Sequence, residues 1–270
     1  MCCAWRWSLV AAGLGLRLPL RTAVAACYQS VFLNATLPGG VLGDVDRAVR
    51  HGRDAGDVGR GVRAVLWERT AGQFVQLGIA VVVLLAFPSP VQRYLPVVTA
   101  VAAAVVLGAL LLSRAGSTVA GGPRWVGRVG SRWASVVRTA RTDLRDGLLA
   151  PGVRVRIVLA SAVVVAGHLT TFLIAAHTAG AGAPLSRLVP LTLLALLAMG
   201  LPVNVGGFGP REGVAAWVFG AAGLTAAQGV ATAVVYGALV LVSSLPGAAV
   251  LIGRRLRVPG AIPAEGASRV

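Results

Sequence analysis

The sequence has no lysine and few charged residues of any kind. Of its 270 residues, 13% are charged, with 9 acidic residues against 25 basic ones, all of them arginine. Soluble domains carry about 25% charged residues, so the composition argues against a soluble protein. Hydrophobic residues make up 56% of the chain, and the mean hydropathy is +0.79. Lipid is therefore the expected solvent, and the length suits one membrane domain.

Residues that support metal or covalent chemistry are scarce and scattered. The candidates are Cys2, Cys3, Cys27, His51, His168 and His177. The cysteines form no disulfide framework, and neither they nor the histidines have the spacing of metal ligands. A lone histidine in an apolar run is more often a helix-to-helix hydrogen-bond contact than a ligand. We therefore expect no metal, no cofactor and no catalytic residue.

The strong positive charge has two candidate partners, nucleic acid and anionic lipid. The net charge is +16. The arginines cluster in short polar segments between apolar runs, which is typical of the cytoplasmic loops of membrane proteins. This placement favours anionic lipid, so we expect no nucleic-acid partner.

Four apolar runs are long enough to cross a bilayer, and each is close to the roughly 20 residues that this requires. They are residues 65–87, 94–113, 155–178 and 228–253. The predicted fold class is an all-α integral membrane protein. It would be a polytopic helical bundle with about four full spans plus short broken or re-entrant half-helices.

The arginines also predict the orientation. Arginine-rich segments lie before the first span, between the second and third, and after the fourth, whereas the loops 88–93 and 179–187 hold one arginine each. Basic segments remain in the cytoplasm. We therefore expect a cell-membrane protein with a cytoplasmic C-terminus, made of a transmembrane domain at 1–253 and a disordered tail at 254–270. Residues 114–154 would form a basic amphipathic segment at the cytoplasmic surface.

Two further apolar regions are interrupted. Segments 188–199 and 214–224 are short and flank a stretch rich in proline and glycine, which cannot hold a regular helix. We favour a re-entrant pair of half-helices here, and two short tilted spans remain the alternative. Residues 21–37 form either a half-helix that enters from the cytoplasm or a full span.

Glycine-rich breaks with charge are the candidate functional elements. The first contains Asn34, Pro38, Gly39, Gly40, Gly43, Asp44 and Arg47. The second contains Pro202, Asn204, Gly206, Gly207, Gly209, Arg211 and Glu212. Each has a proline, a glycine pair, a third glycine, an acid and an arginine, so we interpret them as related halves that converge on one site. The prolines and glycines would break the backbone and let a head group approach closely.

Charged side chains complete the candidate site. A helix that begins near Arg211 would offer N–H groups to an anion, and Glu212 would hold the arginine in place. Glu68 and Arg69 form a third acid–arginine pair near the start of the first span. Charges in lipid are costly and mark either a ligand site or internal ion pairs. Both interpretations remain open.

Taken in order, these motifs resemble the transmembrane domain of lysylphosphatidylglycerol synthases. The matching pieces are Phe32–Asn34, Pro38–Gly40, Gly43–Arg47, Glu68–Arg69 with Gly72, and Pro202–Glu212. That domain also occurs alone in flippase-like membrane proteins. Family members usually carry more membrane segments before the first motif, so we expect a short or truncated form. No aminoacyl-transfer domain is present, and we expect no enzymatic synthesis of lipid.

The resemblance implies movement of an aminoacylated or otherwise modified lipid between leaflets. The partner would be an anionic phospholipid or a polyprenyl-linked lipid. Arg47, Arg69 and Arg211 would contact phosphate, and the carboxylates Asp44, Glu68 and Glu212 would orient them. The alternative is a membrane protein that transports nothing and assists an enzyme of envelope lipid or glycolipid synthesis. It could act as a homo-oligomer or with that enzyme.

Overall fold

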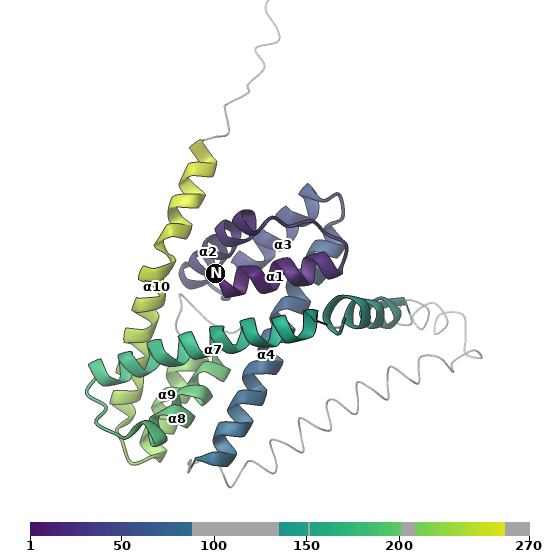
Figure 1. Ribbon diagram of the computed structural model, residues 1–270. Helices are drawn as coiled ribbons and strands as arrows, with labels where there is room; N and C mark the ends of the chain where they lie inside the picture. The colour runs from purple at the N-terminus through teal and green to yellow at the C-terminus, as the bar shows by residue number, and fades with distance from the viewer. Residues whose placement is uncertain (88–134, 151, 201–208, 257–270) are drawn as a thin grey trace, which may run out of the picture.

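All regular structure in the described part of the chain is helical. The computed structural model describes residues 1–87, 135–150, 152–200 and 209–256. The helices are α1 (Cys2–Gly13), α2 (Leu20–Thr36), α3 (Leu42–Asp54), α4 (Val58–Ala86), the short π-helix η2 (Asp143–Leu148), α7 (Val153–Thr178), α8 (Leu185–Ala198), α9 (Pro210–Ala221) and α10 (Ala226–Leu256) (Figure 1). A helical segment at 135–142 leads into η2.

Three of these helices are long and apolar enough to cross a membrane: α4, α7 and α10. They contain the predicted spans 155–178 and 228–253 and all of 65–87 except Phe87, whereas 94–113 lies outside the described residues. All three expose large apolar side chains, among them Leu66, Phe74, Val82, Val158, Val163, Ile174, Val242 and Leu245. Such surfaces suit hydrocarbon as solvent. The protein is therefore a multi-pass helical membrane protein.

Helix α4 begins earlier than predicted. It starts at Val58 rather than at residue 65, because the Asp57 side chain caps it and accepts a hydrogen bond from the Arg60 N–H at 2.8 Å. Arg60 and Arg63, expected in a loop, therefore lie in its first two turns. Glu68 and Arg69 lie well inside the helix, where α3 and α1 pack against it.

The helices form two groups that the long helices connect. Helices α1, α2 and α3 pack together at one end, and α8 and α9 pack together at the other (Figure 1). Helix α4 contacts α1 and α3 in the first group and α8 in the second, while α10 contacts α2 and α9. The order of a short helix followed by a long one also recurs, as α3–α4 and α9–α10. This arrangement places the first break and the start of α9 on either side of a shared interior.

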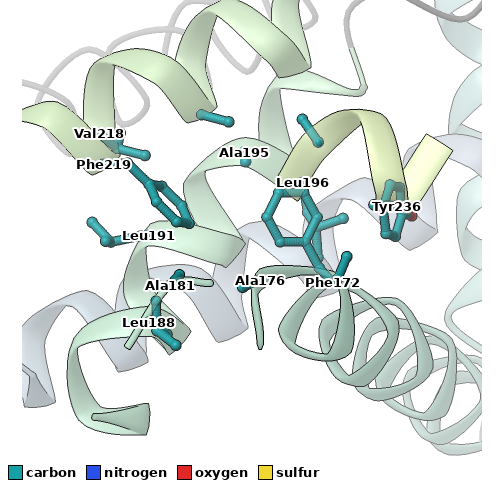
Figure 2. Packing of buried hydrophobic residues seen from close by; sticks show 13 residues of the cluster. Phe172, Ala176, Ala181, Leu188, Leu191, Ala195, Leu196, Val218, Phe219 and Tyr236 are labelled. Atoms are coloured by element: carbon teal, nitrogen blue, oxygen red, sulfur yellow. The ribbon is translucent and has the colours of Figure 1, made fainter. Parts of the chain in front are cut away.

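The largest apolar core joins α7, α8, α9 and α10. Figure 2 shows Phe172, Leu191, Phe219 and Tyr236 among its buried side chains, with Ala176 allowing close approach. The rings of Phe172 and Tyr236 pack at an angle with centroids 5.1 Å apart. The core holds the ring of Tyr236 in place, and its hydroxyl lies next to His168 of α7.

The first break is shorter than predicted. Gly39 and Gly40 have φ values of 90° and 62°, which favour glycine, so the chain reverses at Pro38–Gly40 as expected. Gly43 was predicted to belong to the break, and this is wrong. It lies inside α3, where an added Cβ would be 2.2 Å from the Ser30 carbonyl oxygen. Its role is to allow α3 to pack closely against α2.

Two short helices, α8 and α9, flank the second break in the sequence. Helices α8 and α9 have 14 and 12 residues, so at 1.5 Å per residue each is well short of a bilayer core of about 30 Å. Helix α9 begins at Pro210, which is favourable at a first helical position, so Arg211 and Glu212 lie in its first turn. Re-entrance of the pair stays a prediction, as does the status of α2, which has 17 residues.

Several predictions fall beyond the described residues. Pro202, Asn204, Gly206 and Gly207 lie in the segment 201–208, which is outside them. The same holds for most of the basic segment 114–154 and for nearly all of the tail 254–270. The domain boundary at residue 253 also stays a prediction.

Candidate functional site

The first break and the described end of the second, from Gly209 onward, line one cavity of about 460 Å³. Asn34 and Gly40 line it from the first break, and Gly209, Arg211 and Glu212 line it from the second. The remaining polar lining comes from Arg6, Glu68, Arg69, Gln73, Gln76 and His168. The two motifs, more than 160 residues apart in sequence, thus meet around a single interior space. This meeting is what the interpretation as convergent halves predicts.

Asp44 anchors the first break. Its Oδ1 accepts hydrogen bonds from Ser30 Oγ at 3.0 Å and Arg47 Nε at 2.9 Å. Its Oδ2 accepts from Asn34 Nδ2 at 2.9 Å and forms an ion pair with Arg69. Asp44 therefore ties α2, α3 and α4 together and positions Arg69 at the cavity wall.

Glu68 is the second anchor and is almost fully buried, with 1% of its side chain exposed. Its Oε1 accepts a hydrogen bond from Arg6 Nε at 2.9 Å, and its Oε2 accepts one from Arg47 Nη2 at 2.7 Å. Ser161 on α7 accepts a further bond from Arg6 Nη1 at 2.9 Å. The predicted pairing of Glu68 with Arg69 is wrong. The two side chains are adjacent in sequence but join different ion pairs, because α1 and α3 bring Arg6 and Arg47 to Glu68, whereas Asp44 of α3 binds Arg69.

Arg47 holds helices together through ion pairs and does not line the cavity. It is buried between Asp44 and Glu68, and its guanidinium lies 4.8 Å from the centre of the Trp7 ring. Burial disfavours its charge, but the carboxylates of Glu68 and Asp44 outweigh this effect and raise the pKa of Arg47. The buried position of Arg47, away from the cavity, therefore argues against the predicted contact with a lipid phosphate.

Arg69 is placed to meet a ligand. Its side chain is 42% exposed, lines the cavity and is held at one end by Asp44. No other hydrogen bond to its guanidinium is formed within the described residues, so part of its planar fork faces the open space. A guanidinium held at one end and open at the other suits a phosphate oxygen.

Arg211 faces the same cavity from α9. Its Nε donates to Glu212 Oε1 at 2.8 Å, and its guanidinium lies 5.1 Å from the centre of the Tyr236 ring. Glu212 Oε2 accepts a hydrogen bond from the Gly209 N–H at 2.7 Å. The helix N-terminus, predicted to bind an anion, therefore already holds a carboxylate of its own chain. Arg211 itself remains at the wall, oriented by Glu212 as predicted.

Five lining or supporting residues were missed from the sequence: Arg6, Gln73, Gln76, His168 and Tyr236. Gln73 and Gln76 follow Arg69 at four and seven positions, a spacing that places all three on one helical face. A polar stripe within an apolar run predicts a helical face that lines a polar interior, so Gln73 and Gln76 could have been found from the sequence. His168 Nδ1 and the Tyr236 hydroxyl are 2.7 Å apart, and only the packing of α7 on α10 reveals this contact.

The site carries excess positive charge. Four arginines take part, Arg6, Arg47, Arg69 and Arg211, against three carboxylates, Asp44, Glu68 and Glu212. Within the part of the chain that the structure describes, one positive charge remains at the site, which favours an anionic ligand. Among the described residues, no group of three histidine, cysteine or acidic side chains could hold a metal ion.

Comparison with known protein families places the chain in one of them. The sequence model of the lysylphosphatidylglycerol synthase transmembrane region matches residues 2–247. The chain belongs to this family. Every residue named above in the cavity and its ion pairs lies within the matched part of this lysylphosphatidylglycerol synthase-type membrane region. The curated proteins and the solved structures compared with the chain gave no match.

Proposed function

We propose that the protein binds the phosphate of an anionic or modified lipid in the cavity and moves that lipid across the cell membrane. The observation that carries the proposal is the convergence of Arg69 and Arg211 on one cavity from opposite halves of the fold. Two separately anchored guanidinium groups can hold a phosphodiester between them. The proposed activity is binding and movement, with no covalent step.

The composition of the cavity wall supports a lipid as ligand. Its apolar lining includes Val31, Val164, Val165, Leu196, Val234, Val240 and Leu241 from four helices. The helices around it expose apolar surfaces suited to acyl chains. A head group could occupy the charged part while the chains remain in the bilayer.

The duplicated helix order supports movement between leaflets. Transporters with related halves expose a central site alternately to either side by rocking one half against the other. Here α1–α3 and α8–α9 are the groups that would shift, with α4 and α10 between them. As part of this proposal, α8 and α9 are re-entrant and the C-terminus is cytoplasmic.

Lipid exchange in proteoliposomes tests the proposal. Fluorescent phosphatidylglycerol would be placed in one leaflet, and its appearance in the other would be followed with a membrane-impermeant quencher. We expect Arg69→Ala and Arg211→Ala to slow the exchange by about tenfold or more, because each removes a charge-assisted contact. Arg53→Ala removes an exposed arginine of α3 outside the cavity and is the matched control. Exchange at equal rates by wild type and both cavity variants would overturn the proposal.

A further inference from the structure

We propose that the cavity selects a phosphodiester lipid whose head group carries hydroxyls and no amine. This inference rests on the proposed function and names the class of lipid. The inference rests on two observations. The Arg69 guanidinium and the amides of Gln73 and Gln76 line the cavity side by side, and the carboxylates nearby are already paired with arginines.

The carboxylates give no anionic site for an ammonium group. Glu68 is bound by Arg6 and Arg47, Asp44 by Arg47 and Arg69, and Glu212 by Arg211. The excess charge at the cavity is positive. An aminoacylated head group brings one or two ammonium groups close to these arginines, and like charges in a site of low dielectric repel strongly.

The amides form a neutral hydrogen-bonding row. Gln73 and Gln76 continue the helical face of Arg69 along α4, and all three line the cavity. Neither glutamine makes a hydrogen bond within the described residues. An amide both donates and accepts hydrogen bonds, as a hydroxyl does. Both side chains are half-buried and line the cavity, so the hydroxyls of a polyol beside the phosphate can pair with their amides.

The same row sets the order of contacts along the ligand. Asp44 holds Arg69 near the first break, and the glutamines lie one and two turns further along α4. A phosphate at Arg69 and Arg211 would therefore place the head-group hydroxyls along Gln73 and Gln76. The cavity volume lies within the range of small-molecule sites, about 300–1,000 Å³.

Competitive lipid binding tests the inference. The full chain in detergent would receive equimolar phosphatidylglycerol, phosphatidylinositol, lysyl-phosphatidylglycerol and phosphatidic acid with identical acyl chains, and native mass spectrometry would measure the bound fractions. We expect the two polyol lipids to exceed both others by about fivefold or more, the effect of one or two added hydrogen bonds. The Gln73→Leu/Gln76→Leu variant should bring the ratio of phosphatidylglycerol to phosphatidic acid near one. Gln228→Leu, which removes a glutamine outside the cavity, should leave this ratio unchanged.

The outcomes separate this inference from the proposed function. Equal or better binding of lysyl-phosphatidylglycerol would overturn the selectivity and leave lipid binding intact. A double variant that keeps the wild-type ratio would overturn the role of the glutamines. Binding of none of the four lipids would overturn both proposals. A last experiment adds soluble glycerol 3-phosphate at the same concentration as the lipid. If it displaces the bound lipid, the site binds a soluble polyol phosphate, and a lipid ligand is contradicted.

Discussion

Arg6 Nε donates a hydrogen bond to Glu68 Oε1 at 2.9 Å and so joins α1 to α4 across 62 residues of sequence. Arg47 reaches the other oxygen of the same carboxylate from α3. One buried acid therefore holds two cations and three helices together. The cavity wall at Arg69 depends on this frame, because Arg47 also binds the Asp44 that positions Arg69.

Replacing Glu68 should destabilise the protein severely. Glu68→Gln leaves Arg6 and Arg47 buried with one carboxylate, Asp44, in place of two. Breaking a buried ion pair on one side typically costs about 3–5 kcal/mol, because the remaining charge stays desolvated. Thermal unfolding in detergent should show a lower Tm than wild type. Asp54→Asn, at an exposed acid of α3, is the control and should leave the Tm within error. An unchanged Tm for Glu68→Gln would contradict the anchoring role.

Close packing of α2 on α3 should not tolerate a methyl group. Gly43→Ala would place a Cβ 2.2 Å from the Ser30 carbonyl oxygen, which is rigid backbone. The helices would have to separate, weakening the bond from the Gly43 N–H to Asn34 Oδ1, now 2.7 Å. We expect a loss of about 1–3 kcal/mol. Gly78→Ala on α4 meets nothing within 4 Å and serves as the matched variant. It should be neutral or stabilising by up to about 1 kcal/mol. Equal stability of the two variants, measured by chemical unfolding in mixed micelles, would contradict this account.

Displacing Arg211 without removing its charge should impair lipid binding. In Gly237→Ala the new Cβ would lie 2.7 Å from Arg211 Nη2, the far end of a flexible side chain. The guanidinium would shift while the fold is retained, so the Tm should change little. Phosphatidylglycerol binding should weaken several-fold, because bidentate contacts depend on geometry. Gly167→Ala on α7 meets nothing within 4 Å and is the control. Wild-type affinity in Gly237→Ala would argue against a phosphate contact at Arg211.

Acidification should destabilise α3 through His51. Burial lowers the pKa of His51, with Asp54 opposing the shift, and its buried Nε2 has no hydrogen-bond partner among the residues that the structure describes. The neutral form is therefore favoured in the folded state. Its contribution to stability is complete above the unfolded pKa of about 6.5 and decreases as the pH falls toward the lower folded pKa. The loss is about 1.4 kcal/mol per unit of pKa difference.

The measurement is unfolding free energy between pH 8 and about pH 5 for wild type and His51→Phe, in the range where histidines titrate. The variant keeps a ring against Trp7, which contacts His51 edge-on with centroids 5.5 Å apart. As the pH falls, the free energy of unfolding of the wild type should decrease more than that of His51→Phe. A constant difference would show that His51 is not the responsible group.

The sequence by itself determined the solvent, the long helices and the place of the first break. Each of these depends on local properties: mean hydropathy over about 20 residues, and the φ preferences of Gly39 and Gly40. The order of its motifs also identified the family. Which arginine meets which carboxylate is not a local property. Glu68 selects Arg6 and Arg47 instead of its neighbour Arg69, because helix geometry and the packing of α1 and α3 on α4 decide what a side chain reaches.

Only the tertiary structure decided how the two breaks relate to the cavity. It placed Asn34 and Gly209 around one space, moved Gly43 from a break into a helix contact, and turned Arg47 away from the ligand side. It also added Gln73 and Gln76, which are meaningful only once the face of α4 that lines the cavity is known. Long-range packing fixes these relationships, and a charge within an apolar run shows only that a partner must exist, not which one it is.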